Sequence, residues 1–409
     1  MTSPDLPEVP LRRPGPRGAA EVFLQALRLG LLSFGGPVAH LAYFERTYVQ
    51  RLRWLGADEY AALVALCQVL PGPASSQVGF LIGWRRAGWT GALAAWLAFT
   101  APAALLMFAC ARWAPPAGGI AAGRFVHGLK LVAVAVVAQA VLSMGRRLCA
   151  ERRRLAIALL AAAVVLAAGG GLQLAALLGG GVAGALLCRD GAALPADLAG
   201  YASRRAGGAC LALFAILFAA LPLADALSPH GLVGLAALFF RAGALVFGGG
   251  HVVLPLLRAE LVPSGWISDD AFLAGYGIAQ AMPGPLFAFA AYPGALAGLP
   301  AGHAAVWAAV TVIAIFLPGL LLAAAGSALW QSLLRVPALA GVLAGVNAAV
   351  VGILGAALYN PLWLSAVSRG ADAAIAAVGL ALLERWRVPP VAVVVAMLAL
   401  SLAAAAAGL

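Results

Sequence analysis

The chain has 409 residues, of which 64% are hydrophobic and only 10% are charged. Soluble domains are about 45–50% apolar and about 25% charged, and a chain of this size cannot bury so much apolar surface around a water-soluble core. The formal net charge of +11 comes mainly from arginines in short stretches between apolar runs, which is typical of cytoplasmic membrane loops and argues against a nucleic-acid partner.

Apolar stretches that are long enough for helices recur along the whole chain. The period-two alternation of strands is almost absent. The sequence therefore predicts an all-α polytopic membrane protein with about 12–13 transmembrane segments of roughly 20 residues each. In chain order, the expected segments are residues 22–42, 60–83, 89–110, 124–144, 155–170, 172–188, 207–227, 231–257, 270–298, 303–328, 337–358, 371–384 and 388–408.

Clusters of arginine set the expected orientation, because basic loops stay in the cytoplasm. Counting crossings places three clusters on one side, so residues 1–20 are expected to form a cytoplasmic tail. This tail lacks the apolar core and small-residue cleavage site of a signal peptide. The clusters are Arg12, Arg13 and Arg17; residues 145–154; and Arg189, Arg204 and Arg205.

The second half of the chain repeats the first in four blocks that keep their order. Duplication of this kind is typical of transporters that are built from structural repeats around a central site. We expect repeats over residues 21–189 and 231–409, joined by a connecting loop and span over 190–230, with the second repeat inverted. The matched blocks are 28–46 with 241–258, 54–73 with 266–285, the segments around Pro102 and Pro318, and 128–140 with 345–357.

The motif PGP stands at matching positions in both halves, inside apolar runs. Proline removes a backbone donor and disfavours helix at the residue before it, and a broken helix at membrane depth is tolerated only in protein or around a cavity. The helix that restarts after a break presents N–H groups to an anion. A simple packing kink is the alternative. The substrate-binding candidates here are Pro71, Gly72, Pro73, Ser75, Ser76, Pro283, Gly284 and Pro285.

A second matched pair, SFGGP and VFGGGH, precedes each PGP motif. Consecutive glycines open a helix toward a ligand or let two helices pack closely, and the sequence leaves both interpretations open. The candidates for substrate binding are Gly35, Gly36, Gly248 and Gly249.

Basic residues inside or beside apolar segments form the third group of binding candidates. Intramembrane charge is costly and is by default a functional-site hypothesis, although snorkelling to the interface is the alternative for an arginine near a segment end. Lys130 has Asn347 as its partner in the repeat. The group comprises Arg28, Arg46, Lys130, Arg241, Arg258 and Asn347.

Acidic residues fall at segment ends or in loops, whereas cation transporters and proton pumps rely on intramembrane carboxylates. The residues therefore predict an anion as the substrate. The five scattered cysteines form no disulfide framework or metal motif. No catalytic constellation is visible, so we expect no enzyme activity, no catalytic residue, no cofactor and no metal.

The set FGGP, Q-x-x-PGP, FGGGH, a second Q-x-x-PGP, FLPG and GVNAAVVG resembles the chromate ion transporter (CHR) family in its long two-domain form. The resemblance covers about residues 22–365. It implies efflux of chromate, a tetrahedral oxyanion, across the bacterial inner membrane. It also implies a lipid bilayer as the environment, and it leaves a homodimer open.

The motifs leave the substrate and the driving force open within that class. A transporter of sulfate or another oxyanion would need the same chemistry. We expect the oxyanion between the two PGP breaks, held by backbone N–H groups and by Arg28, Arg241 or Lys130, with one repeat rocking against the other. Anion exchange and exit driven by the membrane potential are both compatible with these residues.

Overall fold

The computed structural model describes residues 15–113, 120–168, 172–188, 202–227, 231–247, 250–333 and 338–407. Helices account for nearly all regular structure in these residues, and no strand occurs among them. This confirms the all-α prediction.

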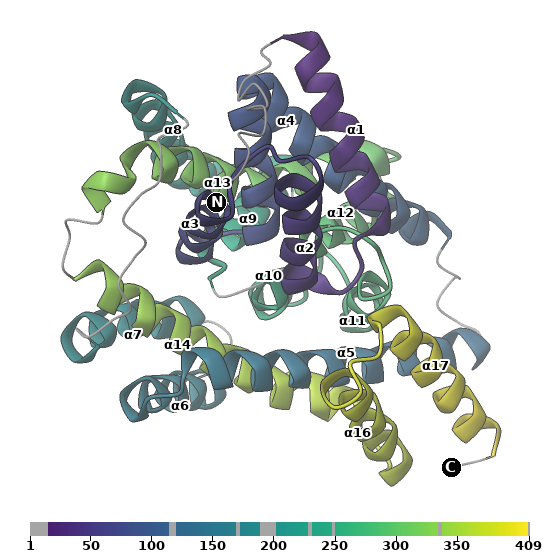
Figure 1. Cartoon of the computed structure of the whole chain (residues 1–409). Coiled ribbons are helices and arrows are strands. Elements are labelled where there is room, and N and C mark those ends of the chain that lie inside the picture. Colours follow the sequence, from purple (N-terminus) through teal and green to yellow (C-terminus); the bar gives the residue numbers. More distant parts are fainter. Residues whose placement is uncertain are drawn as a thin grey trace, which may run out of the picture.

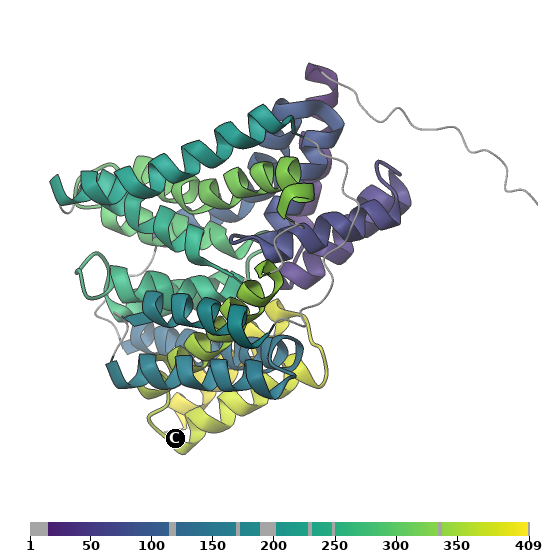
Figure 2. The same ribbon diagram turned by 90° about the vertical axis from the view of Figure 1, so that its left-hand side faces the viewer.

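Helices of the described chain lie in two layers (Figures 1 and 2). The first layer holds α1 (Pro16–Leu32), α2 (Gly36–Phe44), α3 (Ala57–Val69), α4 (Ala74–Trp113), α8 (Arg204–Leu227), α9 (Leu232–Leu245), α12 (Ala291–Gly298) and α13 (Ala304–Leu333). The second layer holds α5 (Ile120–Leu148), α6 (Arg152–Ala168), α7 (Gln173–Leu187), α14 (Leu339–Ala357), α16 (Gly370–Glu384) and α17 (Pro390–Ala406). Between them lie α10 (Val253–Leu261) and α11 (Asp269–Ala279).

Each layer combines segments from both halves of the sequence. In the first layer, α1 packs on α4 and α9 packs on α13, while α12 contacts both α4 and α13. In the second layer, α14 packs against α6 and α7, and α5 packs against α16 and α17. The two halves of the chain are therefore interleaved and do not form separate bodies.

The helices expose large apolar side chains, as expected of a protein in a lipid bilayer. Five described helical stretches are long and apolar enough to cross a bilayer, and shorter apolar helices accompany them. Large side chains such as Leu105, Leu160 and Leu223 are 66%, 67% and 68% exposed, which is expected where lipid replaces water. The chain is an integral membrane protein, and the number of 12–13 spans stays a prediction.

Small residues allow the helices of the second layer to cross closely. A Cβ at Gly345 of α14 would lie 2.0 Å from the Gly180 carbonyl oxygen of α7, and one at Gly352 would lie 1.9 Å from the Ala158 carbonyl oxygen of α6. Neither backbone carbonyl can yield easily, so only glycine fits at these crossings. Small residues are what membrane helices use for close approach.

Gly345→Leu is expected to destabilise the protein by forcing α14 away from α7. Overpacking of an interior typically costs about 1–3 kcal/mol. The atoms that a side chain at residue 345 would meet are backbone atoms of α7, which cannot move aside as a side chain can. Gly355→Leu on the same helix is the matched control, because a Cβ there meets nothing within 4 Å. Thermal unfolding in detergent, followed by intrinsic fluorescence, should show a lower midpoint for Gly345→Leu only. Equal midpoints would contradict this packing account.

Candidate functional site

The expected interruptions of the apolar helices are confirmed at the glycine and proline motifs. Residues 33–35 separate α1 from α2, and residues 70–73 separate α3 from α4. In the second half, α9 ends at Leu245, and residues 280–285 separate α11 from the short 3-10 helix η4 (Leu286–Ala290). The prolines of both PGP motifs, which are Pro71, Pro73, Pro283 and Pro285, are buried or half-buried.

Four motif glycines hold backbone conformations that other residues rarely adopt. The φ angles are 102° at Gly35, 79° at Gly36, 119° at Gly72 and 96° at Gly284. Positive φ favours glycine because it has no Cβ, so the glycines are required by the shape of the breaks. Gly248 and Gly249 lie outside the described residues.

Each PGP glycine is hydrogen-bonded to the helix end of the other half. The Gly72 N–H donates to the Val246 carbonyl oxygen at 2.7 Å, and the Gly284 N–H donates to the Ser33 carbonyl oxygen at 2.9 Å. Ser33 and Val246 occupy matching positions in the two blocks. These bonds satisfy backbone groups that the breaks set free, and they tie the broken helices of the two halves together.

A small cavity, here called the interlayer cavity, lies where the first diglycine meets the second PGP motif. Two helices begin at its wall, α2 at Gly36 and α17 at Pro390. One part of its wall comes from α2, from the short 3-10 helix η3 (Gly250–Val252) and from the end of α11 with the break that follows it. The other part comes from α5, α16 and α17 of the second layer. It is lined by Gly35, Gly36, Pro37, Val136, Gln139, His251, Ala279, Gln280, Met282, Gly284, Leu286, Leu383 and Pro390.

Polar side chains on the wall of the interlayer cavity are Gln139, Gln280 and His251. No carboxylate and no fixed positive charge belongs to the described lining. The Gln139 amide carries two N–H donors, whereas one N–H of Gln280 is donated to the Tyr276 carbonyl oxygen at 3.4 Å, which leaves the second for a ligand. The first turn of α2 adds backbone N–H groups and the positive end of a helix dipole. This wall suits an anion that is bound by neutral donors.

The basic candidates lie elsewhere, and most are ion-paired. Arg28 on α1 and Arg46 in the π-helix η1 (Glu45–Arg51) have exposed side chains. Arg241 pairs with Glu260 at 2.6 Å, and Arg258 pairs with Asp269 at 2.6 Å. None of these four arginines lines the interlayer cavity.

Lys130 joins α5 of the second layer to α11. Its Nζ lies 2.5 Å from Asp270 Oδ1, and its side chain is only 12% exposed while that of Asp270 is 68% exposed. Asp270 lies in the first turn of α11, where a carboxylate also favours the helix N-terminus. The pair therefore fixes the position of α11, whose C-terminal Ala279 lines the cavity.

Ser75 and Ser76 are buried in the first turn of α4. A chain of polar groups connects this turn to the first break: His40 Nδ1 lies 3.3 Å from Ser75 Oγ, and His40 Nε2 lies 3.2 Å from the Ser33 carbonyl oxygen. The same oxygen accepts the Gly284 N–H. Ser75 thus supports the wall of the cavity through His40 and Ser33.

Asn347 is half-buried on α14, and its side-chain oxygen is buried without a hydrogen-bond partner among the described residues. The hydroxyl oxygens of Ser33 and Ser76 are buried in the same way, with no partner in the described part of the chain. Buried polar atoms are usually hydrogen-bonded, so these groups are free to bind water or an ion.

Several polar residues of the structure were not identified from the sequence. Arg86 is 3% exposed, pairs with Glu21 at 3.1 Å and lies 5.0 Å from the centre of the Trp54 ring. Gln139 and Gln280 line the cavity, although no spacing singled out the first of them. The only signal for Gln280 was its place in Q-x-x-PGP.

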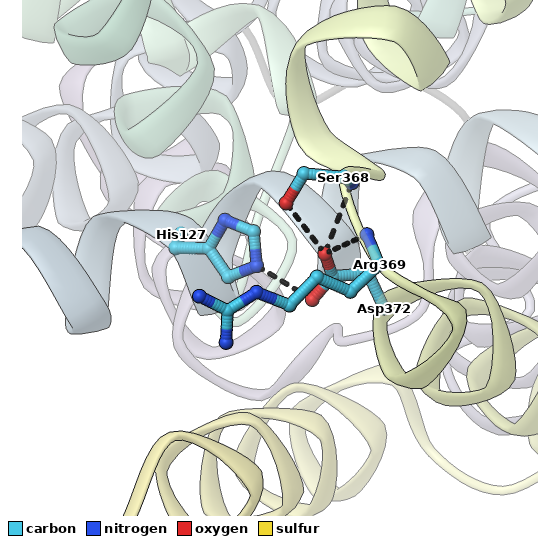
Figure 3. Close-up of polar contacts among 4 residues, drawn as sticks. All are labelled: His127, Ser368, Arg369 and Asp372. Atoms are coloured by element: carbon cyan, nitrogen blue, oxygen red, sulfur yellow. Dashed lines mark hydrogen bonds and ion pairs between the residues drawn. The ribbon is translucent and has the colours of Figure 1, made fainter. Parts of the chain in front are cut away.

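A buried carboxylate fixes α16 to α5 (Figure 3). Asp372 is 6% exposed and accepts hydrogen bonds from the Ser368 and Arg369 backbone N–H groups and from the Ser368 hydroxyl, each at 3.0 Å. His127 Nε2 of α5 lies 2.7 Å from its other oxygen. Asp372 lies in the first turn of α16, and Leu383 near the end of the same helix lines the cavity, so the cluster fixes a helix that forms part of the wall.

Comparison with known proteins relates both halves of the chain to one family. The model of the chromate transporter family matches residues 20–185 and again residues 233–405. No solved structure matches the chain significantly.

Curated relatives are similar over most of their length. The chromate transport protein of Pseudomonas aeruginosa is 32% identical over 95% of this chain and 92% of its own. The probable chromate transport protein of Synechococcus elongatus is 29% identical over 81% of each chain. The chromate transport protein of Cupriavidus metallidurans is 27% identical over 82% of this chain and 80% of its own.

Proposed function

This chain belongs to the chromate transporter family, and we propose that it carries chromate out of the cell across the bacterial inner membrane by way of the interlayer cavity. Chromate transport across a membrane follows from the family and from the relatives. The outward direction, the inner membrane and the binding site are the proposal. The protein is a transporter and not an enzyme.

The observation that carries the binding site is the composition of the cavity wall. An anion loses its hydration on entering a membrane protein and needs donors in return. Gln139 on α5 and the second N–H of Gln280 after α11 supply donors on this wall, and α2 begins there. The absence of a carboxylate from the described lining removes the repulsion that would exclude a dianion.

We assign the motif glycines and the basic residues to different roles in this proposal. Gly35, Gly36 and Gly284 shape the wall and bring backbone close to the oxyanion. Lys130, Arg241 and Arg258 act in ion pairs that position α10 and α11. Arg28 and Arg46, which are exposed, attract anions from solution toward the protein.

Transport requires that the cavity open to each side of the membrane in turn. Because the broken helices of both halves are bonded to each other, they move together, and the first layer shifts against the second. This differs from a rocking of one repeat against the other. The substrate lies between the layers, so a small shift of α5, α16 and α17 changes its access.

Two inverted repeats would explain the interleaved layers. The matched blocks, the two separate matches of the family model and the crossed bonds of Gly72 and Gly284 support this part of the proposal. Inversion predicts that the loops that follow Arg46 and Arg258 face opposite sides. Accessibility reporters inserted after each position measure this directly, and labelling of both from the same side would refute the inversion.

The membrane potential is sufficient to drive the proposed efflux. Moving a charge across the membrane is worth about 2.3 kcal/mol per 100 mV, so a dianion leaves a negative cytoplasm spontaneously. The wall of neutral donors does not select among tetrahedral oxyanions by charge. Sulfate is therefore the competing substrate.

Flux into inside-out vesicles tests the proposed function. Vesicles with the purified protein should accumulate chromate when the potential is applied, and protein-free vesicles should not. Excess sulfate should reduce the flux only weakly if chromate is preferred. Sulfate flux without chromate flux would reassign the substrate, and no flux of either would refute the proposal.

A further inference from the structure

His251 is the titratable residue of the described cavity lining. It lies in the short 3-10 helix η3 (Gly250–Val252), directly after the second diglycine motif. Its Nδ1 lies 2.8 Å from the Tyr276 hydroxyl of α11. Its Nε2 makes no hydrogen bond with any described residue, so one edge of the ring remains available to a molecule in the cavity.

The elements around η3 offer His251 no fixed charge. It packs against α10, α14 and η4, of which α14 and η4 contain no titratable residue. On α10, Arg258 and Glu260 are paired with Asp269 and Arg241. The titratable group in contact with His251 among the described residues is therefore the Tyr276 hydroxyl of α11.

The other elements that line the cavity also bring no unpaired charge to its described wall. On α2, His40 is bonded to Ser33 and Ser75, and Tyr43 lies outside the lining. On α5, Lys130 and His127 are paired with Asp270 and Asp372. Near α17, Arg385 and Arg387 are exposed and do not line the cavity, and Glu384 is paired with Arg146.

A dianion in this cavity meets only partial positive charges from amides and helix ends. Burying a charge without a counter-charge is expensive. A protonated imidazole would provide a full positive charge at the point where the anion binds, with Nδ1–H directed to the Tyr276 oxygen and Nε2–H to the oxyanion. When the cavity is empty, a neutral imidazole avoids a buried cation.

We propose that His251 is a proton-binding site of this transporter, which takes up one proton from solution when the oxyanion binds and releases it with the oxyanion. Anion and proton then strengthen each other's binding, because linkage between two sites is reciprocal. The transported unit is one proton with one oxyanion, so a chromate dianion crosses with a net single negative charge. This inference rests on the proposed function and adds the coupled ion.

Calorimetric titration of the purified full-length protein with chromate tests the proton uptake. The titration is run in two buffers of different ionisation enthalpy at about pH 8, where an unperturbed histidine is neutral and chromate is a dianion. The difference in heat should correspond to about one proton taken up per chromate, as linkage requires. Chromate binding without proton uptake overturns the proposal and leaves the proposed function intact.

Two variants locate the proton. His251→Gln keeps a hydrogen-bonding group toward Tyr276 but cannot titrate, so its proton uptake should vanish while weaker chromate binding remains. His303→Gln is the matched control, because His303 is exposed and lies outside the cavity lining. Undiminished uptake in His251→Gln overturns the assignment. A wild-type protein that binds no oxyanion at all refutes the proposed function as well.

Discussion

Gly284→Val is expected to reduce chromate flux strongly while the protein remains folded. The φ angle of 96° at Gly284 is strained for any residue with a Cβ and worst for a β-branched one. A Cβ there would also lie 3.2 Å from the Ala103 Cβ and 3.3 Å from the Phe99 carbonyl oxygen. The backbone must therefore move, which breaks the bond to Ser33 and deforms the cavity wall.

The expected loss is large because strain and lost geometry add. A left-handed conformation costs a residue other than glycine about 1–2 kcal/mol, and each 1.4 kcal/mol corresponds to about a tenfold change in an equilibrium. We therefore expect vesicle flux to fall at least about tenfold.

Gly265→Val is the matched control for backbone strain. Gly265 has φ of 76° in the exposed turn after α10, and a Cβ there meets nothing within 4 Å. This variant should keep most of its flux at equal amounts of protein in the vesicles. Equal losses in the two variants would mean that strain alone, wherever it lies, limits transport.

Removal of the two cavity amides is expected to weaken chromate binding without unfolding the protein. A hydrogen bond to a charged group contributes about 1.5–3 kcal/mol, so Gln139→Leu and Gln280→Leu should each raise the concentration for half-maximal flux about 10- to 100-fold. Leucine keeps a similar volume and removes the N–H donors.

Concentration dependence of flux measures this effect, and Gln50→Leu provides the control. Gln50 is exposed on η1 and lies outside the cavity lining. Its replacement should leave the curve unchanged. Unchanged curves for both cavity variants would remove the interlayer cavity as the binding site.

Much of the fold could be predicted from the sequence. Apolar segments gave the all-α membrane class, and the two PGP motifs gave the positions at which the helices break. Ser268 caps α11 through a side-chain oxygen that accepts a hydrogen bond from the Ala271 N–H. These features depend on local chemistry that a short window of residues contains.

The pairing of distant residues could not be predicted in this way. Lys130 is a substrate-binding candidate in the sequence, but Asp270, 140 residues further along the chain, lies 2.5 Å from its Nζ. The repeat pattern matched Gly72 with Gly284, yet the bonds cross to Val246 and Ser33 of the opposite halves. These partners depend on how the two halves pack together in space, and a local sequence pattern carries no information about that packing.

Neutral residues of the cavity were missed for a related reason. Gln139 lies in an apolar helix with no distinctive spacing, and His251 follows a glycine motif without a metal or catalytic partner. Their role follows from their meeting with Gly36 and Gln280 around one space. Charged residues stand out in an apolar sequence, whereas the described cavity wall carries none.

The position of bound chromium in the protein tests this account most directly. A structure of the full-length protein with chromate, in which the anomalous scattering of chromium is located, distinguishes the cavity from every basic residue outside it. We predict a single strong chromium peak in the interlayer cavity, in contact with Gly36, Gln139 and Gln280. An empty cavity with the chromium beside Arg28, Arg46 or Lys130 would contradict the account.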